Sequence, residues 1–190
     1  MVDSDELVVL VDQRDTPIGL APKLAAHRDG LLHRAVSVLL FDDTGRVLLQ
    51  RRAAGKYHSP SLWSNTCCGH PRPNESSHDA ACRRLREEMG IANCPIEFAG
   101  WFVYRAEGLG ALIEFEVDHV YVGRWSGPPH PDPLEVASWR WCTLDELRGD
   151  LASSPRSHTV WLPKLLAHLG MVLHADGPAA PRPHMTSVPE

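Results

Sequence analysis

Short apolar runs separated by turn residues divide the first part of the chain into strands. Residues 6–11 form one β-rich run, and the polar residues and Pro17-Ile18-Gly19 after it indicate a turn and a returning segment. Residues 35–41 and 46–51 form two more such runs, joined through Asp42-Asp43-Thr44-Gly45. Because Asp and Gly between apolar runs are typical of tight connections, the pattern predicts a β-hairpin here.

A helical period replaces the strand pattern over residues 76–89. Ala81, Leu85 and Met89 recur every fourth residue, which places them on one face of a helix and predicts that this face is buried. Side-chain oxygens that can cap the free amides of a first turn come from Asn74, Ser76 and Ser77.

The second half of the chain predicts further strands and two more helices. Strand-like runs cover residues 98–104, 112–122 and 136–141. Thr143-Leu144-Asp145-Glu146 has the spacing of a capping box, which predicts the start of a short helix. Residues 159–173 carry leucines at helical spacing, and Pro163 places the regular start of this helix near residue 162.

Strands and helices therefore mix without a regular βαβ alternation. This order favours an α+β fold with a mixed sheet. Residues 175–190 are rich in Pro, Ala and Gly, so we expect a disordered tail there and a single domain over residues 1–174. A chain of 190 residues is long enough to bury a core without disulfides or a structural metal.

Composition narrows the classes of function. The net charge is -5 and charges of both signs are interspersed, which argues against a nucleic-acid partner. No apolar run approaches the ~18 residues that a membrane span needs, and no signal peptide is apparent, so a cytoplasmic protein without a membrane partner is expected. The five cysteines lack a C-x-x-C pair and are expected to be reduced thiols, with Cys67-Cys68 in a loop where a reactive thiol could be exposed.

Histidines and glutamates in several segments make a metal site plausible. Glu114 and Glu116 are two residues apart in a predicted strand, so both carboxylates face the same side. Each histidine alone is more often structural or exposed than a ligand, and the case depends on the conjunction of His27, His33 and His70 with these acids. Imidazole and carboxylate together suit Zn, Mn or Fe better than Mg alone.

The segment from Gly69 to Ile91 resembles the Nudix box, G-x5-E-x7-R-E-U-x-E-E-x-G-U with U a bulky aliphatic residue. The resemblance implies a loop–helix–loop whose glutamates hold a divalent metal against a diphosphate, in a Nudix-like mixed sheet with flanking helices, an α/β/α sandwich. One specified acid is replaced by Arg84. A cation at that place removes a carboxylate expected of diphosphate-hydrolysing relatives and suits a site that grips a diphosphate without cutting it.

A second run of residues, next to the box, resembles one particular family more specifically. Residues 62–71, Leu-Trp-Ser-Asn-Thr-Cys-Cys-Gly-His-Pro, together with Arg51-Arg52-Ala53, Tyr104-Arg105-Ala106 and Glu114-x-Glu116, closely resemble the type 1 isopentenyl diphosphate isomerases over residues 5–165. The similarity implies interconversion of isopentenyl and dimethylallyl diphosphate by protonation at one carbon and deprotonation at another.

The resemblance also implies roles for individual residues. The catalytic group would be Cys68, Glu116 and Tyr104. The second divalent metal, Mn²⁺ or Zn²⁺, would be held by His27, His33, His70, Glu114 and Glu116, and Mg²⁺ on the diphosphate by Glu88. The basic diphosphate contacts would be Lys23, Arg52, Lys56 and Arg84, with Trp161 as a cation-shielding or packing residue. No flavin is implied, and the oligomeric state is left open.

Chemical reasoning supports these roles. An alkene is a very weak base, so its protonation passes near a tertiary carbocation that needs π faces, negative groups and a dry pocket. Glu116 could donate the proton and Cys68, as a thiolate, could remove another. Because neighbouring residues of a strand face opposite ways, Cys67 or Cys68 could point into the site.

Two alternatives remain from the sequence. A Nudix hydrolase of a nucleoside diphosphate derivative would share the box but would not need Cys68, the histidines or Tyr104. A non-catalytic Nudix-like binding module would be expected to lose reactive residues, whereas every such position is filled here. Asp118-His119 and the interval between His27 and His33 depart from some members of the family.

Overall fold

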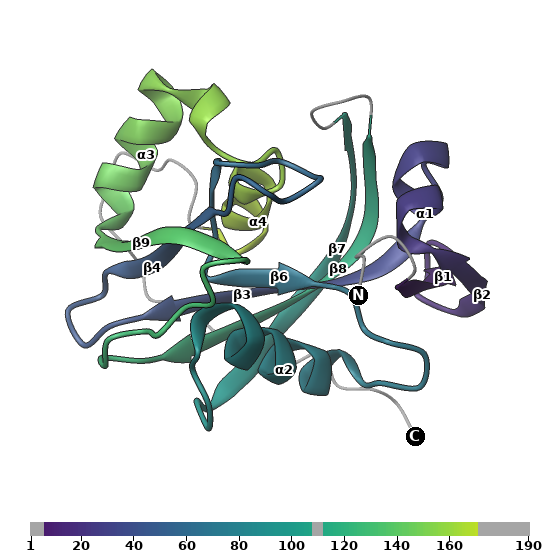
Figure 1. Ribbon diagram of the computed structural model, residues 1–190, viewed down its shortest axis with the longest axis horizontal. Helices are drawn as coiled ribbons and strands as arrows, with labels where there is room; N and C mark the ends of the chain where they lie inside the picture. The colour runs from purple at the N-terminus through teal and green to yellow at the C-terminus, as the bar shows by residue number, and fades with distance from the viewer. Residues whose placement is uncertain (1–5, 108–111, 171–190) are drawn as a thin grey trace.

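A mixed sheet forms the centre of the molecule (Figure 1). The computed structural model describes residues 6–107 and 112–170. The strands are β1 (Leu7–Val11), β2 (Pro17–Pro22), β3 (His33–Phe41), β4 (Val47–Arg52), β5 (Trp63–Ser64), β6 (Cys67–Gly69), β7 (Ile96–Glu107), β8 (Ile113–Arg124) and β9 (Val136–Cys142). The helical segments are α1 (Lys23–Asp29), α2 (Ser77–Met89), α3 (Leu144–Ser153), a 3-10 turn η2 (Pro155–Ser157) and α4 (Leu162–His168).

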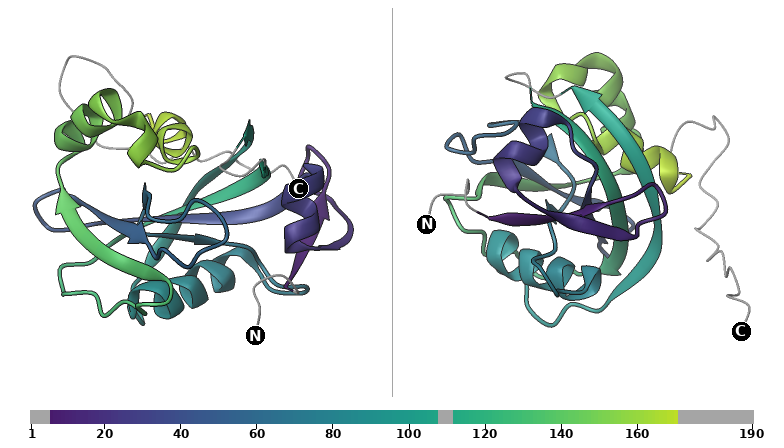
Figure 2. Two further views of the ribbon diagram at one scale, coloured as in Figure 1. Left: turned by 45° about the horizontal axis from the view of Figure 1, so that its top comes forward. Right: turned by 90° about the vertical axis from the view of Figure 1, so that its right-hand side faces the viewer.

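Strand β3 is buried on both faces and organises the layers. It pairs in parallel with β8 from His33↔Glu116 onward and antiparallel with β6. Val36 and Val38 of β3 belong to the core under α2, whereas Leu39 belongs to the core under α3 and α4. This alternation puts one helical layer on each side of the sheet (Figure 2), which confirms the predicted α+β, α/β/α architecture.

Helix α2 forms as its sequence pattern predicts. Ala81, Leu85 and Met89 are buried in the core. The Ser76 hydroxyl accepts a hydrogen bond from the Asp79 amide at 3.0 Å, which caps the first turn. The capping box of α3 is also confirmed, because the Thr143 and Glu146 side chains each bond the other residue's backbone amide.

Helix α1 is not predicted by the sequence patterns. It follows β2 directly and ends at Gly30, which adopts a left-handed φ of 63°. The β1–β2 hairpin and α1 lie beside β8, where Gly30 packs closely against Ile113. This placement brings Lys23 and His27 to the end of the central strands.

The predicted hairpin over residues 35–51 is confirmed, but its two strands pair over only a short length. The Asp42 carboxylate accepts hydrogen bonds from the Thr44 and Arg46 amides, and the chain reverses there. However, β3 and β4 share only the pair Phe41↔Val47, and β4 continues against β9. The turn specifies only a reversal, whereas the strand partners are those that bury both faces of β3.

The predicted C-terminal helix over residues 159–173 is observed as the shorter α4. The predicted tail at residues 175–190 and the domain end at residue 174 lie outside the described residues and remain predictions. Within residues 6–107 and 112–170, no helix has the length and apolar character needed to cross a lipid bilayer.

Candidate active site

One cavity collects residues from α1, β3, the loop after β4, β6, α2, β7 and β8. All the site residues expected from the sequence line it except His33 and Glu88, which are fully buried beside it. The wall also contains residues that the sequence did not indicate, among them Ser37, Tyr57 and His58. Groups far apart in the sequence therefore share one enclosed space.

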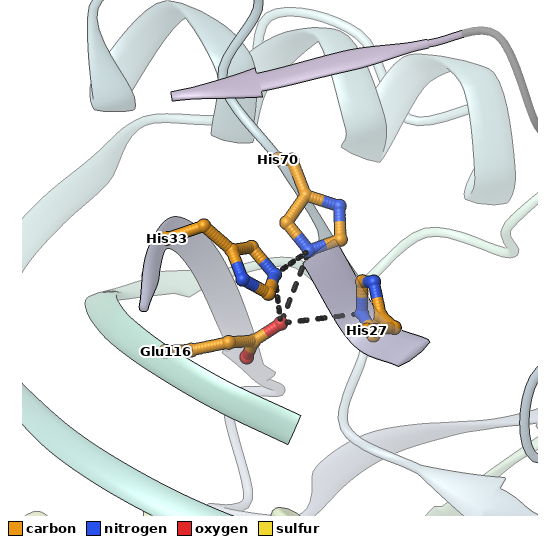
Figure 3. A group of neighbouring side chains, drawn as sticks. All are labelled: His27, His33, His70 and Glu116. Atoms are coloured by element: carbon orange, nitrogen blue, oxygen red, sulfur yellow. Dashed lines mark hydrogen bonds and ion pairs between the residues drawn. The ribbon is translucent and has the colours of Figure 1, made fainter. Parts of the chain in front are cut away.

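Three imidazoles and one carboxylate converge at the end of β3 and β8 (Figure 3). The ligand atoms of His27, His33, His70 and Glu116 all lie within 4.8 Å of one another, and all four side chains are buried. Glu116 Oε1 is 3.0 Å from His70 Nε2 and 3.5 Å from His33 Nε2. The pairing of His33 with Glu116 in the β3–β8 register explains why these two side chains meet.

The donor set fits a divalent metal. His27 Nδ1 is 2.8 Å from the Lys23 carbonyl oxygen and His33 Nδ1 is 2.8 Å from the Leu31 carbonyl oxygen. Carbonyl oxygens only accept, so each Nδ1 carries a proton, and each Nε2 is the nitrogen that would bind a metal after losing any proton of its own. Three nitrogen donors and a carboxylate oxygen are ligands that Zn²⁺ and Mn²⁺ accept.

The two glutamates of β8 have different surroundings. Burial would raise the pKa of Glu116, but hydrogen bonds from His33 and His70 hold that pKa well below its usual value. Burial and the neighbouring Glu116 raise the pKa of Glu114. Glu114 Oε2 lies 3.3 Å from His27 Nε2, so this carboxylate borders the cluster without belonging to its four converging donors.

Tyr104 and Cys68 are the other groups capable of carrying a proton. The Tyr104 hydroxyl donates to Glu116 Oε2 at 2.6 Å, and burial together with the Glu116 charge raises the pKa of Tyr104 well above its usual value. Cys68 pairs with Ser37 across β6 and β3 and faces the cavity, whereas Cys67 is buried in the core under α2. The alternation of strand side chains thus decides which thiol reaches the cavity.

The thiolate role expected of Cys68 remains a prediction, and the surroundings of the sulfur oppose its ionisation. Burial raises the pKa of Cys68 to about 12, against the opposing effect of Arg52, whose Nη1 lies 3.7 Å from the sulfur. Burial therefore favours the protonated thiol in this arrangement of side chains. Cys68 is therefore suited to donate a proton rather than to accept one.

Arg84 lies against β6, the strand that carries Cys68, and its Nε is 3.4 Å from the Cys68 carbonyl oxygen. Its Nη2 donates to Glu88 Oε1 at 2.7 Å and to Glu135 Oε2 at 3.1 Å. The Gly69 backbone is so close that a Cβ there would lie 2.8 Å from Arg84 Cγ. The glycine of the box therefore provides room for the arginine that departs from the box.

The basic wall of the cavity consists of Lys23, Arg52, Lys56 and Arg84. Ion pairs hold its two lysines in place. Lys56 Nζ is 2.6 Å from Glu135 Oε2, and Lys23 Nζ is 3.1 Å from Glu6 Oε2.

Both Glu88 oxygens accept hydrogen bonds, Oε1 from Arg84 and Oε2 from Gln50 at 2.6 Å. Its predicted contact with Mg²⁺ remains a prediction.

Trp161 has a fixed orientation in the cavity wall. Its Nε1 donates to Asn65 Oδ1 at 3.0 Å and to Ser64 Oγ at 3.1 Å. The ring lies 5.5 Å from the Arg52 guanidinium carbon. The buried indole N–H is thus satisfied by two polar residues, Ser64 and Asn65, and these hydrogen bonds fix the orientation of the ring.

The sequence patterns missed two buried polar groups near the cluster. Ser37 Oγ donates to Asp118 Oδ2 at 2.8 Å, and burial raises the pKa of Asp118 well above its usual value. His58 lies in the loop after β4 and lines the cavity. Asp118 continues the period of Glu114 and Glu116 along β8, which was an available signal, whereas nothing in the spacing of His58 indicated its position.

Comparison with known proteins agrees with this geometry. The NUDIX domain family model matches residues 31–165. A solved structure, DR0079 from Deinococcus radiodurans, superposes with a TM-score of 0.72 at 21% identity and covers 85% of this chain and 98% of its own. The MutT protein from Methanosarcina mazei Go1 superposes with a TM-score of 0.54 at 21% identity, covering 62% of this chain and 81% of its own. The fold and the loop–helix–loop define a NUDIX domain protein.

Relatives found by sequence similarity identify a particular family among the NUDIX domain proteins. An isopentenyl-diphosphate Delta-isomerase 1 from Aromatoleum aromaticum is 54% identical over 83% of this chain and 89% of its own length. Isopentenyl-diphosphate Delta-isomerases from Burkholderia multivorans and Nocardia farcinica are 50% and 52% identical, over 90% and 84% of this chain and 97% and 91% of their own lengths. The chain belongs to the isopentenyl-diphosphate Delta-isomerase family.

Proposed function

We propose that this enzyme interconverts isopentenyl diphosphate and dimethylallyl diphosphate. The observation that carries the proposal is a single cavity lined by the Cys68 thiol, the Glu116 carboxylate and the basic residues Lys23, Arg52, Lys56 and Arg84. The family of the chain fits the same reaction. A hydrolase would need neither Cys68 nor the Tyr104–Glu116 pair.

We infer that Cys68 and Glu116 are the two proton carriers. In the isopentenyl direction, the Cys68 thiol proton adds to the terminal methylene carbon, and Glu116 removes a proton from the methylene next to the resulting cationic carbon. The double bond moves by one position, and one proton has passed from sulfur to carboxylate. Arg52 would stabilise the thiolate left behind. The opposite direction exchanges the two roles.

Tyr104 and Trp161 support this transfer without carrying it alone. The Tyr104 hydroxyl holds Glu116 Oε2, so the carboxylate keeps one orientation. The indole face of Trp161 can stabilise the cationic carbon and exclude water from it. Loss of the Tyr104 hydroxyl should therefore reduce turnover less than loss of the Glu116 carboxylate.

The metal roles are those that the family resemblance implies, and the four converging donors of the cluster are compatible with them. His27, His33, His70, Glu114 and Glu116 would hold Mn²⁺ or Zn²⁺, and Glu88 would contact Mg²⁺ on the diphosphate. A divalent cation at the histidine cluster supplies positive charge that orients the Glu116 carboxylate, and Mg²⁺ supplies charge that neutralises the diphosphate. No flavin enters this scheme.

The basic wall would bind the diphosphate. Lys23, Arg52, Lys56 and Arg84 line one cavity, and guanidinium groups suit bidentate phosphate contacts. Glu135 holds both Lys56 and Arg84, which brings these two cations close together before any ligand arrives. An isoprenoid diphosphate is the small-molecule partner that this combination of basic wall and proton carriers fits.

The direct test incubates purified protein, Mg²⁺ and Mn²⁺ with isopentenyl diphosphate. We expect dimethylallyl diphosphate to form in the absence of free phosphate, with both followed by ³¹P and ¹H NMR. Release of phosphate without the isomer would favour the hydrolase alternative. Formation of neither, with retained binding of the diphosphate, would favour a binding module.

Replacing Arg84 tests the deviation from the box. We expect Arg84→Gln to raise the KM for isopentenyl diphosphate by about tenfold to 10²-fold, because a charge-assisted phosphate contact is worth about 1.5–3 kcal/mol. Turnover at saturating substrate should change much less. Arg86→Gln, on an exposed part of the same helix, is the matched control. An unchanged KM for Arg84→Gln would contradict a role of this arginine in diphosphate binding.

Removing metal tests the histidine cluster. After dialysis against a strong chelator, we expect isomerase activity to fall by at least about tenfold, because positioned carboxylates in such sites depend on their metal. Mn²⁺ or Zn²⁺ should restore activity at micromolar concentration, and Mg²⁺ alone should not. Full activity of metal-depleted protein with Mg²⁺ alone would rule out a required second metal.

A further inference from the structure

His58 occupies a tightly constrained loop between β4 and β5. Its side chain is only 4% exposed, although the residue belongs to no helix or strand. Ser59 and Ser61, on either side of Pro60, have φ angles of 47° and 61°. Non-glycine residues in this region of backbone space are strained, so surrounding contacts must hold the loop in place.

His58 makes contacts on three sides. Its backbone carbonyl accepts hydrogen bonds from Arg52 Nε at 3.2 Å and from Arg52 Nη2 at 3.1 Å. Its ring stacks on Trp161, with centroids 5.6 Å apart and an interplanar angle of 18°. Its Nε2 lies 2.7 Å from Glu114 Oε1. One residue thus joins the basic wall, the aromatic wall and the acidic edge of the metal cluster.

The distance between His58 Nε2 and Glu114 Oε1 is short, but the angle at the hydrogen is not that of a well-aligned hydrogen bond. Among the described residues, His58 Nε2 has no hydrogen-bond partner of good alignment, although Glu114 Oε1 is the oxygen beside it. A carboxylate oxygen accepts hydrogen bonds, so the ring nitrogen that faces Glu114 Oε1 at 2.7 Å is the one assigned the N–H. A buried carboxylate is costly without such a donor.

The two oxygens of Glu114 consequently face different partners. Oε1 lies beside His58, and Oε2 lies beside His27 Nε2 at 3.3 Å. A donor that holds Oε1 prevents rotation of the carboxylate and keeps Oε2 at the edge of the histidine cluster. Residues that orient ligands in this way commonly change metal affinity by about 10–100-fold when they are removed.

We propose that His58 is a positioning residue for the divalent-metal site and acts through Glu114. Its imidazole N–H holds Glu114 Oε1, so that Oε2 stays directed at the cluster of His27, His33, His70 and Glu116. Its stacking on Trp161 ties the same loop to the aromatic wall. The inference rests on the proposed function only for its kinetic consequence, because metal binding can be measured without turnover.

Two substitutions separate the effect of the His58 N–H donor from the effect of its aromatic ring. His58→Phe keeps a ring that can stack on Trp161 and removes the N–H donor. His58→Gln keeps an N–H donor and removes the ring. We expect His58→Phe to weaken binding of Mn²⁺ or Zn²⁺ by about tenfold or more. We expect His58→Gln to bind metal within about threefold of the parent protein, since its amide can still hold Glu114.

The affinities are measured on metal-depleted full-length protein by titration with Mn²⁺ or Zn²⁺ against a competing chelator. A double-mutant cycle with Glu114→Gln tests whether His58 affects metal binding through Glu114. If His58 acts through Glu114, His58→Phe should have little further effect in the Glu114→Gln background. Equal effects in both backgrounds would overturn the proposal, as would parent-like metal affinity of His58→Phe.

A matched control is His158→Phe. His158 is also a histidine with 4% exposure, its Nδ1 bonds the Ser154 carbonyl oxygen, and it does not line the cavity. We expect its metal affinity to match the parent protein, and an equal loss there would overturn the assignment. Should His58→Phe fail to unfold cooperatively on heating, His58→Leu replaces it with the same expectation.

The outcomes for His58 and for the enzyme are distinguishable. If the parent protein binds metal but does not isomerise its substrate, the proposed function fails and the coupling of His58 to Glu114 is still measured. If the parent isomerises and His58→Phe keeps both its metal affinity and its kcat, the positioning role fails alone. A fall in kcat with an unchanged KM for the diphosphate, together with weaker metal binding, supports the role.

Discussion

Replacing Cys68 by alanine is expected to lower the rate of isomerisation by about 10³-fold, within the range of about 10²–10⁴-fold for a positioned general acid or base. The thiol is the only protonated sulfur among the described residues that lines the cavity, and burial raises its pKa to about 12. Its loss leaves the alkene without this proton donor. The measurement is the initial rate of dimethylallyl diphosphate formation at saturating substrate.

Two further variants make the result for Cys68 specific. Cys67→Ala removes the adjacent thiol, which is buried in the core under α2, and should keep turnover within a few-fold of the parent despite some loss of stability. Cys68→Ser keeps the shape but offers a much weaker acid and should resemble Cys68→Ala. In D₂O, the parent should incorporate deuterium into product. Near-normal rates for Cys68→Ala would refute its role as a proton carrier.

Replacing Glu116 by glutamine should have the largest effect of any single substitution. The carboxylate is the proposed proton acceptor, and one of its oxygens belongs to the metal cluster. Two losses therefore combine, and we expect turnover to fall by about 10³–10⁴-fold and the affinity for Mn²⁺ or Zn²⁺ to fall by about 10-fold or more. Both quantities are measured on the same preparation, turnover by product formation and affinity by competitive titration.

The controls for Glu116 separate its two functions. Tyr104→Phe removes the hydrogen bond to Glu116 Oε2 and leaves the metal-facing oxygen, so it should lower turnover with little change in metal affinity. Glu97→Gln, at an exposed position of β7, should change neither quantity. If Glu116→Gln bound metal normally and retained most of its turnover, both the metal ligand and the proton acceptor would have to lie elsewhere.

Local elements were largely predictable, because their causes are local. The Ser76 cap, the stripe of Ala81, Leu85 and Met89, and the capping box at Thr143 each involve residues within a few positions of one another. Helix α1 escaped prediction because it has only seven residues and no side-chain cap hydrogen bond at its start. Its position depends on packing against β8, which the sequence pattern does not show.

The residues of the site could be predicted where they belong to recognisable sequence motifs. Each expected residue lies in the cavity or directly beside it, including His27 and Glu116, which are far apart in the sequence. Their assigned roles came from the family resemblance and remain predictions for experiment. The protonation state of Cys68 could not be predicted from the sequence, because the pKa of a thiol depends on burial and neighbouring charge.

By itself, the sequence determined the family, the amphipathic helix of the box and the residues available for chemistry, since these depend on residue identity and short spacing. Only the tertiary structure decided which strands pair, which of two adjacent thiols faces the cavity, and that His58 reaches Glu114. The physical reason is that each of these depends on contacts between segments far apart in the chain, such as His33 with Glu116 and His58 with Glu114, which short spacing does not specify.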